Sequence, residues 1–459
     1  MLQSRTIQKE NKMGTEPIGS LLIRMSIPMM CSMLVQAFYN VVDSIFVSRI
    51  NEAALTAVSM AFPVQNLMIA VATGTGVGVN ALLSRSLGEK NQERANDTAN
   101  AAIFLAVMSC IVFTVLGAFG SHAFMAAQIS RAEASREALL LYGTQYVRIV
   151  TTLSFGIFGQ IALEKIMQST GRTVMTMLTQ GMGAIINIIL DPILIFGLFG
   201  APRLEVVGAA LATVTGQILG MFLGIYLCLR HNPEVTLSWR GILRPKKDVI
   251  GQIYAVGVPS ILMASIGSVM TFCMNKILMG FTATATAVFG VYFKIQSFFF
   301  MPMFGLNNGM VPIVAYNYGA RNRTRVLDAQ KYAMRYAYGI MAVGLFVFEV
   351  FPDKVLALFN ASENMLAIGV PALRIICTSY VFAAFCIVSS SFFQALGNSV
   401  YSLIISLVRQ LGVLVPVAFL MSLTGNLLLV WLSYPIAELA SVTLAAIFRR
   451  RIMREKLDF

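Results

Sequence analysis

The sequence has little charge and almost no histidine. Only 12% of its 459 residues are Asp, Glu, Lys or Arg, and there are two histidines. A soluble domain usually carries about 25% charged residues. The charges that are present cluster in short runs between long apolar stretches. This composition argues against a soluble globular protein.

Several motifs of nucleotide-binding proteins, enzymes and metal-binding proteins are also missing. There is no GxxxxGK[ST] loop, which argues against ATP as an energy source. There is no cluster of His, Asp or Ser of the kind that an enzyme site needs. The six cysteines form no CxxC pair and lie in apolar segments, so we interpret them as packing residues. We therefore expect a protein that is not an enzyme and needs no cofactor.

What the sequence does contain is a series of apolar stretches, 57% of its residues being hydrophobic. Crossing a bilayer takes about 20 apolar residues in a helix, whereas a β-barrel strand needs shorter segments of alternating polarity. The stretches are long and continuously apolar, so we predict an all-α membrane protein. Its twelve predicted spans are 20–48, 55–84, 98–120, 138–163, 173–199, 206–230, 249–279, 285–317, 329–351, 365–394, 401–421 and 427–448.

The net charge is +13, and the distribution of the basic residues over the loops predicts the orientation of these spans. With twelve spans both termini lie on one side, and most Lys and Arg residues fall on that side, in the termini and the loops after even-numbered spans. Cytoplasmic loops carry this excess. We therefore predict a multi-pass protein of the bacterial inner membrane with cytoplasmic termini. No basic run is interleaved with aromatic residues, so nucleic acid is not an expected partner.

The two halves of the chain repeat each other. "IRMSIPMM" around Pro28 recurs as "YAVGVPSI" around Pro259, and "SRSLGEKNQERA" around Gly88 recurs as "AYNYGARNRTRV" around Gly319, both 231 residues later. Internal symmetry of this kind is typical of transporters. We predict two pseudo-symmetric six-helix bundles with a binding cavity between them. Their predicted bounds are 1–230 and 249–459, joined by a cytoplasmic loop over 231–248.

Two acids within the first bundle are the main candidates for function, because ionisable groups inside a membrane are costly. Asp191 lies four residues after Asn187, hence on the same helical face, and Pro192 frees the carbonyl of residue 188. The next span presents Thr213, and the first span carries Asp43. This oxygen-rich set suits a proton or a hard cation such as Na⁺. If the two carboxylates meet, repulsion and poor solvation would let one of them exchange a proton near neutral pH.

Six further residues are candidates for the wall of the cavity. They are polar, charged or soft side chains within the predicted spans: Tyr39, Asn40, Gln65, Lys294, Met274 and Glu438. Lys294 and Glu438 could balance other charges or line the cavity. Glu349 and Arg409 are near predicted span ends, and we expect their side chains to extend towards the head groups.

These segments resemble the multidrug and toxic compound extrusion (MATE) transporters over nearly the full length. The matching stretches include "YNVVDSIFVSRI", "GTGVGVNALLSRSLGEKN", "NIILDPILIFG" and "VGAALATV". The pattern is most similar to the DinF-like prokaryotic branch. The resemblance implies a V-shaped cleft between two bundles, alternating access, and export of organic cations in exchange for H⁺ or Na⁺. It also implies coupling through Asp43 and Asp191, with Asn187 and Thr213 completing the polar cluster.

The function expected from the sequence is therefore secondary active export of organic, often cationic, compounds or amphipathic drugs. The alternative is an exporter or flippase of a lipid-linked or amphipathic metabolite, which would favour strong cationic groups in the cavity. We expect the lipid bilayer as surroundings and a monomer as the functional unit.

Overall fold

The computed structural model describes residues 11–129, 135–359 and 361–458, and within these ranges it contains helices and no strand. The helices of the first half are α1 Lys12–Thr15, α2 Ile18–Ser48, α3 Glu52–Gly88, α4 Gln92–Gln128, α5 Arg136–Thr152, α6 Phe155–Ser169, α7 Thr173–Phe196, the 3₁₀ turn η1 Leu198–Gly200, and α8 Val206–His231. Those of the second half are α9 Trp239–Leu243, α10 Lys247–Met279, α11 Ala283–Gly319, α12 Arg323–Val350, α13 Pro352–Ala357, α14 Glu363–Cys377, α15 Tyr380–Ala395, α16 Ser399–Leu407, the π-helical segment η2 Val408–Leu414, α17 Val415–Ser422, α18 Leu427–Trp431 and α19 Ser433–Lys456.

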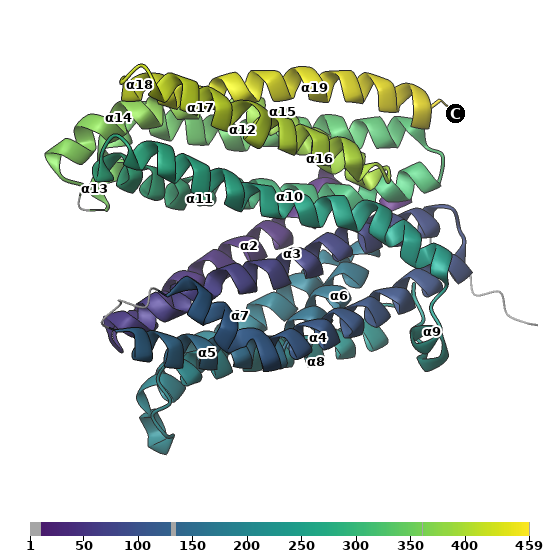
Figure 1. The fold of residues 1–459 in the computed structure, drawn as a ribbon. Coiled ribbons are helices and arrows are strands. Elements are labelled where there is room, and N and C mark those ends of the chain that lie inside the picture. The colour runs from purple at the N-terminus through teal and green to yellow at the C-terminus, as the bar shows by residue number, and fades with distance from the viewer. Residues whose placement is uncertain (1–10, 130–134, 360, 459) are drawn as a thin grey trace, which may run out of the picture.

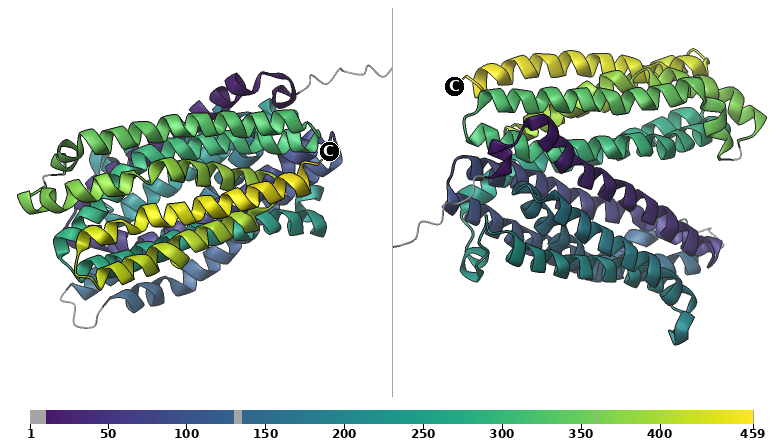
Figure 2. Two further views of the ribbon diagram at one scale, coloured as in Figure 1. Left: turned by 90° about the horizontal axis from the view of Figure 1, so that it is seen from above. Right: turned by 180° about the vertical axis from the view of Figure 1, so that it is seen from behind.

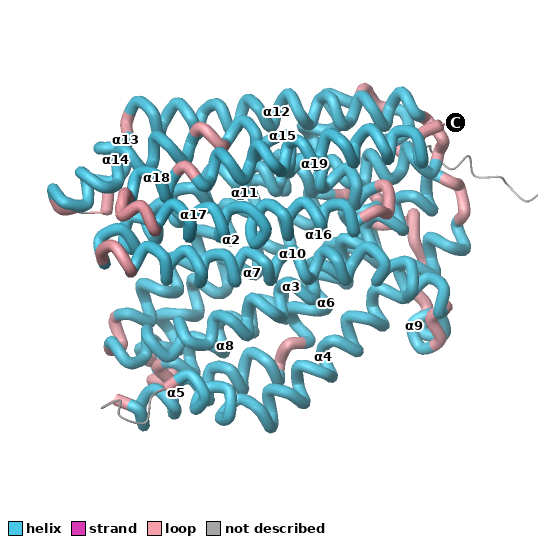
Figure 3. Tube along the Cα trace, turned by 45° about the horizontal axis from the view of Figure 1, so that its top comes forward, coloured by secondary structure: helices cyan, strands magenta, loops and turns pink. Residues whose placement is uncertain are grey.

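The predicted all-α architecture with twelve spans is confirmed. In the described part of the chain, ten helical segments are long and apolar enough to cross a bilayer. Two bent pairs, α5–α6 and α14–α15, complete twelve when each pair counts as one span. The helices run broadly alongside one another, and most loops lie at their two ends (Figure 3).

The two bends occur at equivalent places in the two halves. The angle is 44° between α5 and α6 and 48° between α14 and α15. At the first bend Thr152 donates its hydroxyl back to the carbonyl of Arg148, and at the second Ser379 donates to the carbonyl of Ile376. Hydroxyls that bond to the preceding turn compete with the helix ladder and bend it. The sequence predicted both spans but neither bend.

The helices form two lobes, α2–α8 and α10–α19 (Figure 1). Seen from behind, the lobes come together at the end that carries the C-terminus and diverge towards the opposite end (Figure 2). Helices α2 and α3 pack against α11 and α10 across the lobe boundary. The hydroxyl of Ser26 on α2, for example, donates to the carbonyl of Leu306 on α11 at 3.3 Å.

The repeated motifs around Gly88 and Gly319 meet where the lobes converge. A Cβ atom at Gly88 would overlap the carbonyl oxygen of Tyr316, and one at Gly319 would overlap that of Arg85. Only glycine therefore lets the ends of α3 and α11 cross this closely. Two residues beyond each glycine, Lys90 and Arg321 both have positive φ, of 55° and 53°. The same turn thus closes both helices.

The short helix α1 connects the lobes at this end. Arg325 on α12 donates to the carbonyls of Met13 at 3.0 Å and Glu16 at 2.7 Å. On the other side, the amide of Asn11 donates to the carbonyl of Thr170, which follows α6, at 3.3 Å. It also donates to the carboxylate of Glu234 in the loop between the lobes. We call residues 11–16 the N-terminal clasp.

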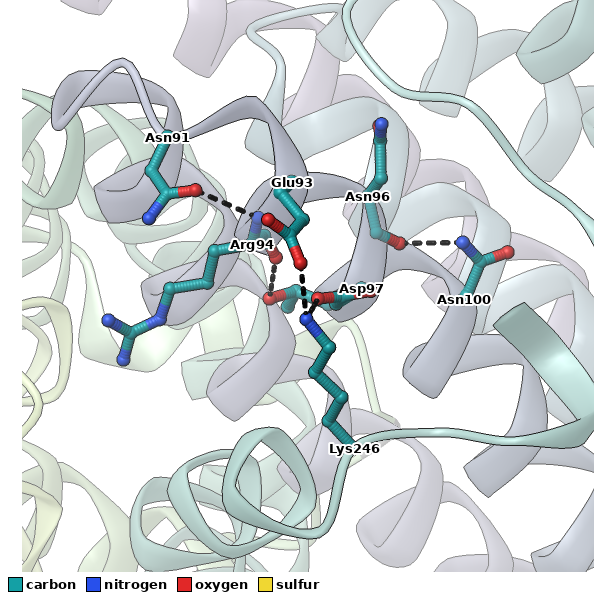
Figure 4. A network of polar contacts seen from close by, with 8 residues as sticks. Asn91, Glu93, Arg94, Asn96, Asp97, Asn100 and Lys246 are labelled. Atoms are coloured by element: carbon teal, nitrogen blue, oxygen red, sulfur yellow. Dashed lines mark hydrogen bonds and ion pairs between the residues drawn. The ribbon is translucent and has the colours of Figure 1, made fainter. Parts of the chain in front are cut away.

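The loop between the lobes packs on the start of α4 (Figure 4). Lys246 forms ion pairs with Glu93 at 2.6 Å and Asp97 at 2.7 Å. The hydrogen bonds that the Lys246 ammonium donates to Asp97 and Glu93 hold the pKa of Lys246 above its ordinary value. The amide of Asn100 donates to the carbonyl of Asn96, within the same patch of α4. These contacts tie the second lobe's first long helix, α10, to the first lobe.

Candidate functional site

The structure brings the four predicted ion-coupling residues together inside the first lobe. Asp43 on α2 and Asp191 on α7 lie close enough for their carboxyl groups to interact. When the Asn187 amide is oriented so that both its ends are satisfied, it donates to Asp191 at 3.3 Å. It then accepts from the backbone N–H of Thr213 on α8 at 3.1 Å. The four side chains come from three helices and form one polar cluster.

Close packing of α7 on α8 positions this cluster. A Cβ atom at Gly216 would lie 2.5 Å from the carbonyl oxygen of Gly183, so glycine is required at this crossing. The same Cβ would lie 3.6 Å from the Cβ of Asn187. The narrow separation allows Thr213, one turn earlier on α8, to reach the Asn187 amide. Pro192 lies within α7 directly after Asp191 and removes one ladder hydrogen bond there.

The two carboxylates have little compensation from the protein. Asp191 is fully buried, and one oxygen of each acid has no hydrogen-bond partner among the residues that the structure describes. Among the described residues, neither acid forms an ion pair with Lys or Arg. Two negative charges this close in an apolar lobe repel each other strongly. The arrangement can therefore hold a proton or another small cation between the acids.

The donors in the cluster suit H⁺ or Na⁺ better than a transition metal. They are carboxylate, amide and hydroxyl oxygens, which are hard ligands. In the described part of the chain, no group of three or more His, Cys, Asp and Glu residues is placed to hold a metal ion.

Aromatic and amide side chains lie around the acids, and one of them was not predicted. Tyr39 on α2 is close enough to Asp43 to be influenced by its charge. Tyr146 on α5 is buried within reach of both acids and accepts a hydrogen bond from Gln65 at 3.0 Å. Tyr146 follows a polar stretch in the sequence, and no local signal marked it as functional.

A second buried polar cluster on α6 was also missed. Glu164 accepts hydrogen bonds from Gln160 at 2.9 Å, Thr179 at 3.0 Å and Gln180 at 2.8 Å. The predicted span ended at residue 163, which assigned Lys165 to a cytoplasmic loop. This assignment was wrong, because α6 continues to Ser169 and both residues are buried. The sequence did contain a signal that the helix continues, because further apolar residues follow Glu164 and Lys165.

A cavity of about 890 Å³ lies between the lobes. Its wall comes mainly from α10, α11, α15 and the α16–η2 segment, with α3 and α6 contributing from the first lobe. Its volume is within the range of about 300–1,000 Å³ that is usual for small-molecule sites. Phenylalanines form much of the apolar wall: Phe62, Phe293, Phe300 and Phe304.

Lys165 belongs to the part of this wall where the two lobes meet. Its ammonium group donates to the side-chain oxygens of Gln168 at 2.9 Å and of Asn308 on α11 at 3.2 Å. Gln168 in turn donates to the backbone carbonyl of Asn308 at 2.7 Å. These bonds join α6 of the first lobe to α11 of the second.

The six residues predicted for the cavity wall lie elsewhere. Tyr39 and Gln65 belong to the surroundings of the acids, Asn40 and Lys294 are exposed on their helices, Met274 is fully buried in the second lobe, and Glu438 is buried on α19. None of the six is part of the wall of the 890 Å³ cavity. The helical face that a residue occupies depends on how the helices pack, which the sequence did not reveal.

Arg409 was predicted to extend towards the head groups, and this prediction was wrong. It lies in η2, lines the cavity, and forms an ion pair with Glu438 at 3.2 Å. Pro416 explains why the segment η2 is π-helical, because the missing N–H of this proline disturbs the helix ladder one turn before it. Pairing with Arg409 also explains how a carboxylate is tolerated inside the second lobe.

Known proteins share this architecture. The family model described as MatE matches residues 28–193 and 259–420, one match in each lobe. The chain belongs to the MatE family. This MatE-family chain is 24% identical over 442 residues to the multidrug export protein MepA of Staphylococcus saprophyticus, covering 95% of each chain. It is 27% identical over 454 residues to the probable multidrug resistance protein YoeA of Bacillus subtilis, covering 98% of this chain and 96% of that one.

A solved structure described as the outward-facing conformation of a multidrug resistance MATE family transporter superimposes on this MatE-family chain with a TM-score of 0.89. The two are 26% identical, and the match covers 97% of this chain and 98% of that one. The resemblance to MATE transporters is thereby confirmed, and the assignment to the DinF-like branch stays a prediction.

Proposed function

We propose that the protein is a secondary active exporter of small organic compounds, driven by H⁺ or Na⁺ moving in the opposite direction. The observation that carries this proposal is the Asp43–Asp191 pair in the first lobe of a two-lobed MatE-family protein. Asp191 is fully buried, and among the described residues neither acid forms an ion pair with Lys or Arg. Its similarity to a multidrug export protein and to a probable multidrug resistance protein supports organic compounds as the cargo.

The positions of the two sites suggest how coupling operates. The acids lie inside the first lobe, whereas the cavity lies between the lobes. Because α2 contacts α7 near the acids and α11 near the cavity, an ion that neutralises the acids can change the packing of α2 against both. With the termini in the cytoplasm of a bacterial cell, the diverging ends of the lobes face outwards. The closed end with its clasp then separates the cavity from the cytoplasm.

The proposal is tested with purified protein in proteoliposomes, using a panel of fluorescent cationic, neutral and anionic compounds. A pH gradient and a Na⁺ gradient are imposed separately, so that the driving ion is identified. We expect Asp43→Asn and Asp191→Asn each to abolish gradient-driven export. Asp353→Asn is the matched control, since this exposed acid on α13 is far from the cluster in the fold. Export that continues in both cluster variants would refute the coupling site, and no export of any compound by the wild type would refute the transporter.

A further inference from the structure

We infer that the inter-lobe cavity selects amphipathic organic acids, with the oxyanion head bound at Lys165 and Asn307 and the apolar body against the phenylalanines of α11. This inference rests on the proposed function, since it names the class of compound that the exporter would carry. It differs from the expectation of organic cations that the family resemblance implied.

The charge of the cavity wall is the first argument. Among the described residues that line the cavity there is no Asp or Glu, while Lys165 and Arg409 are part of the wall. Arg409 is neutralised by its ion pair with Glu438 at 3.2 Å. Among the described residues, the hydrogen-bond partners of Lys165 are neutral, the side chains of Gln168 and Asn308. The described wall of the cavity therefore carries one positive charge without an ion-pair partner and no negative charge.

Glu164 is the acid nearest to Lys165 in sequence, but it faces other groups. Its carboxylate accepts hydrogen bonds from Gln160, Thr179 and Gln180 inside the first lobe. In the described part of the chain it forms no ion pair with Lys165. Glu164 thus lowers the positive potential at Lys165 without cancelling it. A buried ammonium group of this kind is stabilised when an anion approaches it.

Hydrogen-bonding capacity is the second argument. The Lys165 ammonium has three N–H groups, and two are used by Gln168 and Asn308. Asn307, the neighbour of Asn308 on α11, is 5% exposed and lines the cavity. Neither the nitrogen nor the oxygen of its side-chain amide has a hydrogen-bond partner among the described residues. A buried amide without partners is unfavourable, and a carboxylate or phosphate oxygen bound beside Lys165 would accept from both.

The apolar wall fits the remainder of such a molecule. Phe293, Phe300 and Phe304 recur along α11 and face the cavity together with Phe62 of α3. Aromatic faces would also receive an organic cation, so they do not decide the sign of charge. The sign of charge is decided by the ammonium group of Lys165 and the amide of Asn307 at the junction of the lobes.

The test uses three probes that share a pyrene group and a butyl linker: 4-(1-pyrenyl)butyrate, the corresponding alcohol and the corresponding trimethylammonium compound. Fluorescence anisotropy is measured with the full-length protein in nanodiscs of zwitterionic lipid, with empty nanodiscs as the blank. We expect the carboxylate to bind at least about tenfold more tightly than the trimethylammonium compound, equivalent to about 1.4 kcal/mol.

Variants connect this preference to Lys165. Lys165→Gln should remove the difference between the charged probes, and Lys165→Arg should keep it. Binding of the alcohol should stay unchanged in both, which shows that the cavity is intact. Lys294→Gln is the matched control, because Lys294 is exposed and lies outside the cavity wall. Repeating the titration with phosphatidylglycerol in the nanodiscs distinguishes a soluble acid from a lipid head group, since only a lipid occupant competes.

The inference is overturned if the wild type binds the trimethylammonium probe as tightly as the carboxylate, or if Lys165→Gln keeps the preference for the carboxylate. Either result leaves the proposed function standing as long as the wild type exports any probe along a gradient. A wild type that binds the carboxylate selectively but exports no probe would instead refute the proposed function alone.

Discussion

The ion pair between Arg409 and Glu438 allows a quantitative test, because its two members have different surroundings. The side chain of Arg409 is 24% exposed and that of Glu438 is 11% exposed. Arg409 lines the cavity and can turn towards water, whereas the second oxygen of Glu438 is buried and has no hydrogen-bond partner in the described part of the chain. The two single substitutions should therefore have unequal effects on stability.

The expected magnitudes follow from these surroundings. Removing one partner of a buried pair costs about 3–5 kcal/mol because the other charge is left uncompensated. Arg409→Gln leaves the Glu438 carboxylate inside the lobe, and we expect a loss of about 3 kcal/mol, at the low end of that range. Glu438→Gln leaves a guanidinium that can reach water, so a loss of about 1 kcal/mol is expected. The double variant should be more stable than the sum of the two losses predicts.

Unfolding can be followed through a tryptophan in the same lobe. Trp431 on α18 is fully buried, and Trp239 is the other tryptophan of the sequence. Replacing the exposed Trp239 with Phe makes Trp431 the single reporter during titration with SDS in mixed micelles. Arg451→Gln serves as the control, since its solvent-exposed pair with Glu455 should contribute little to stability. Equal losses for the two single variants, or additive losses in the double variant, would refute the reasoning.

Two further predictions concern the closed end of the lobes. Gly319→Ala places a methyl group against the backbone of α3, so we expect stability to fall by about 1–3 kcal/mol and export to be impaired. Gly339→Ala on α12 is the control, because a methyl group there meets open space and should change neither property. Equal behaviour of the two variants would show that the crossing of α3 and α11 is not tight. Arg325→Ala removes two of the hydrogen bonds that hold the N-terminal clasp, which should weaken its docking by about 2–3 kcal/mol and speed tryptic cleavage after Lys12. The exposed Arg323→Ala is its control, and an unchanged cleavage rate in Arg325→Ala would mean that other contacts hold the clasp.

The membrane spans could be predicted because each depends on local composition. A continuous apolar run of sufficient length favours a helix in a bilayer wherever it lies in the chain. The helix ends were less predictable. Because the fourth span was predicted to end at residue 163, Glu164 and Lys165 were not recognised as residues of a helix inside the fold. Both lie there because α6 runs to Ser169. The bends after Thr152 and near Ser379 coincide with hydroxyls that donate back to carbonyls of the preceding turn, and hydropathy does not detect them.

The candidate ion site could be recognised in part. An acid within an apolar run is costly, so Asp43 and Asp191 stood out without any structure. The spacing of Asn187 and Asp191 placed them on one helical face. From the sequence, the contact between Asp43 on α2 and α7 could only be assumed, because no local pattern specifies which distant helices pair. The structure supplied this contact and added Tyr146.

By itself, then, the sequence determined an all-helical membrane protein with repeated halves and two unusual acids. These properties follow from local transfer free energies and from motifs that can be compared directly. The tertiary structure decided what faces the inter-lobe cavity: Lys165, Asn307 and Arg409 rather than Lys294, Met274 and Glu438. The physical reason is that a membrane helix is apolar both towards lipid and towards its neighbours, so its sequence carries little information about which face turns inwards.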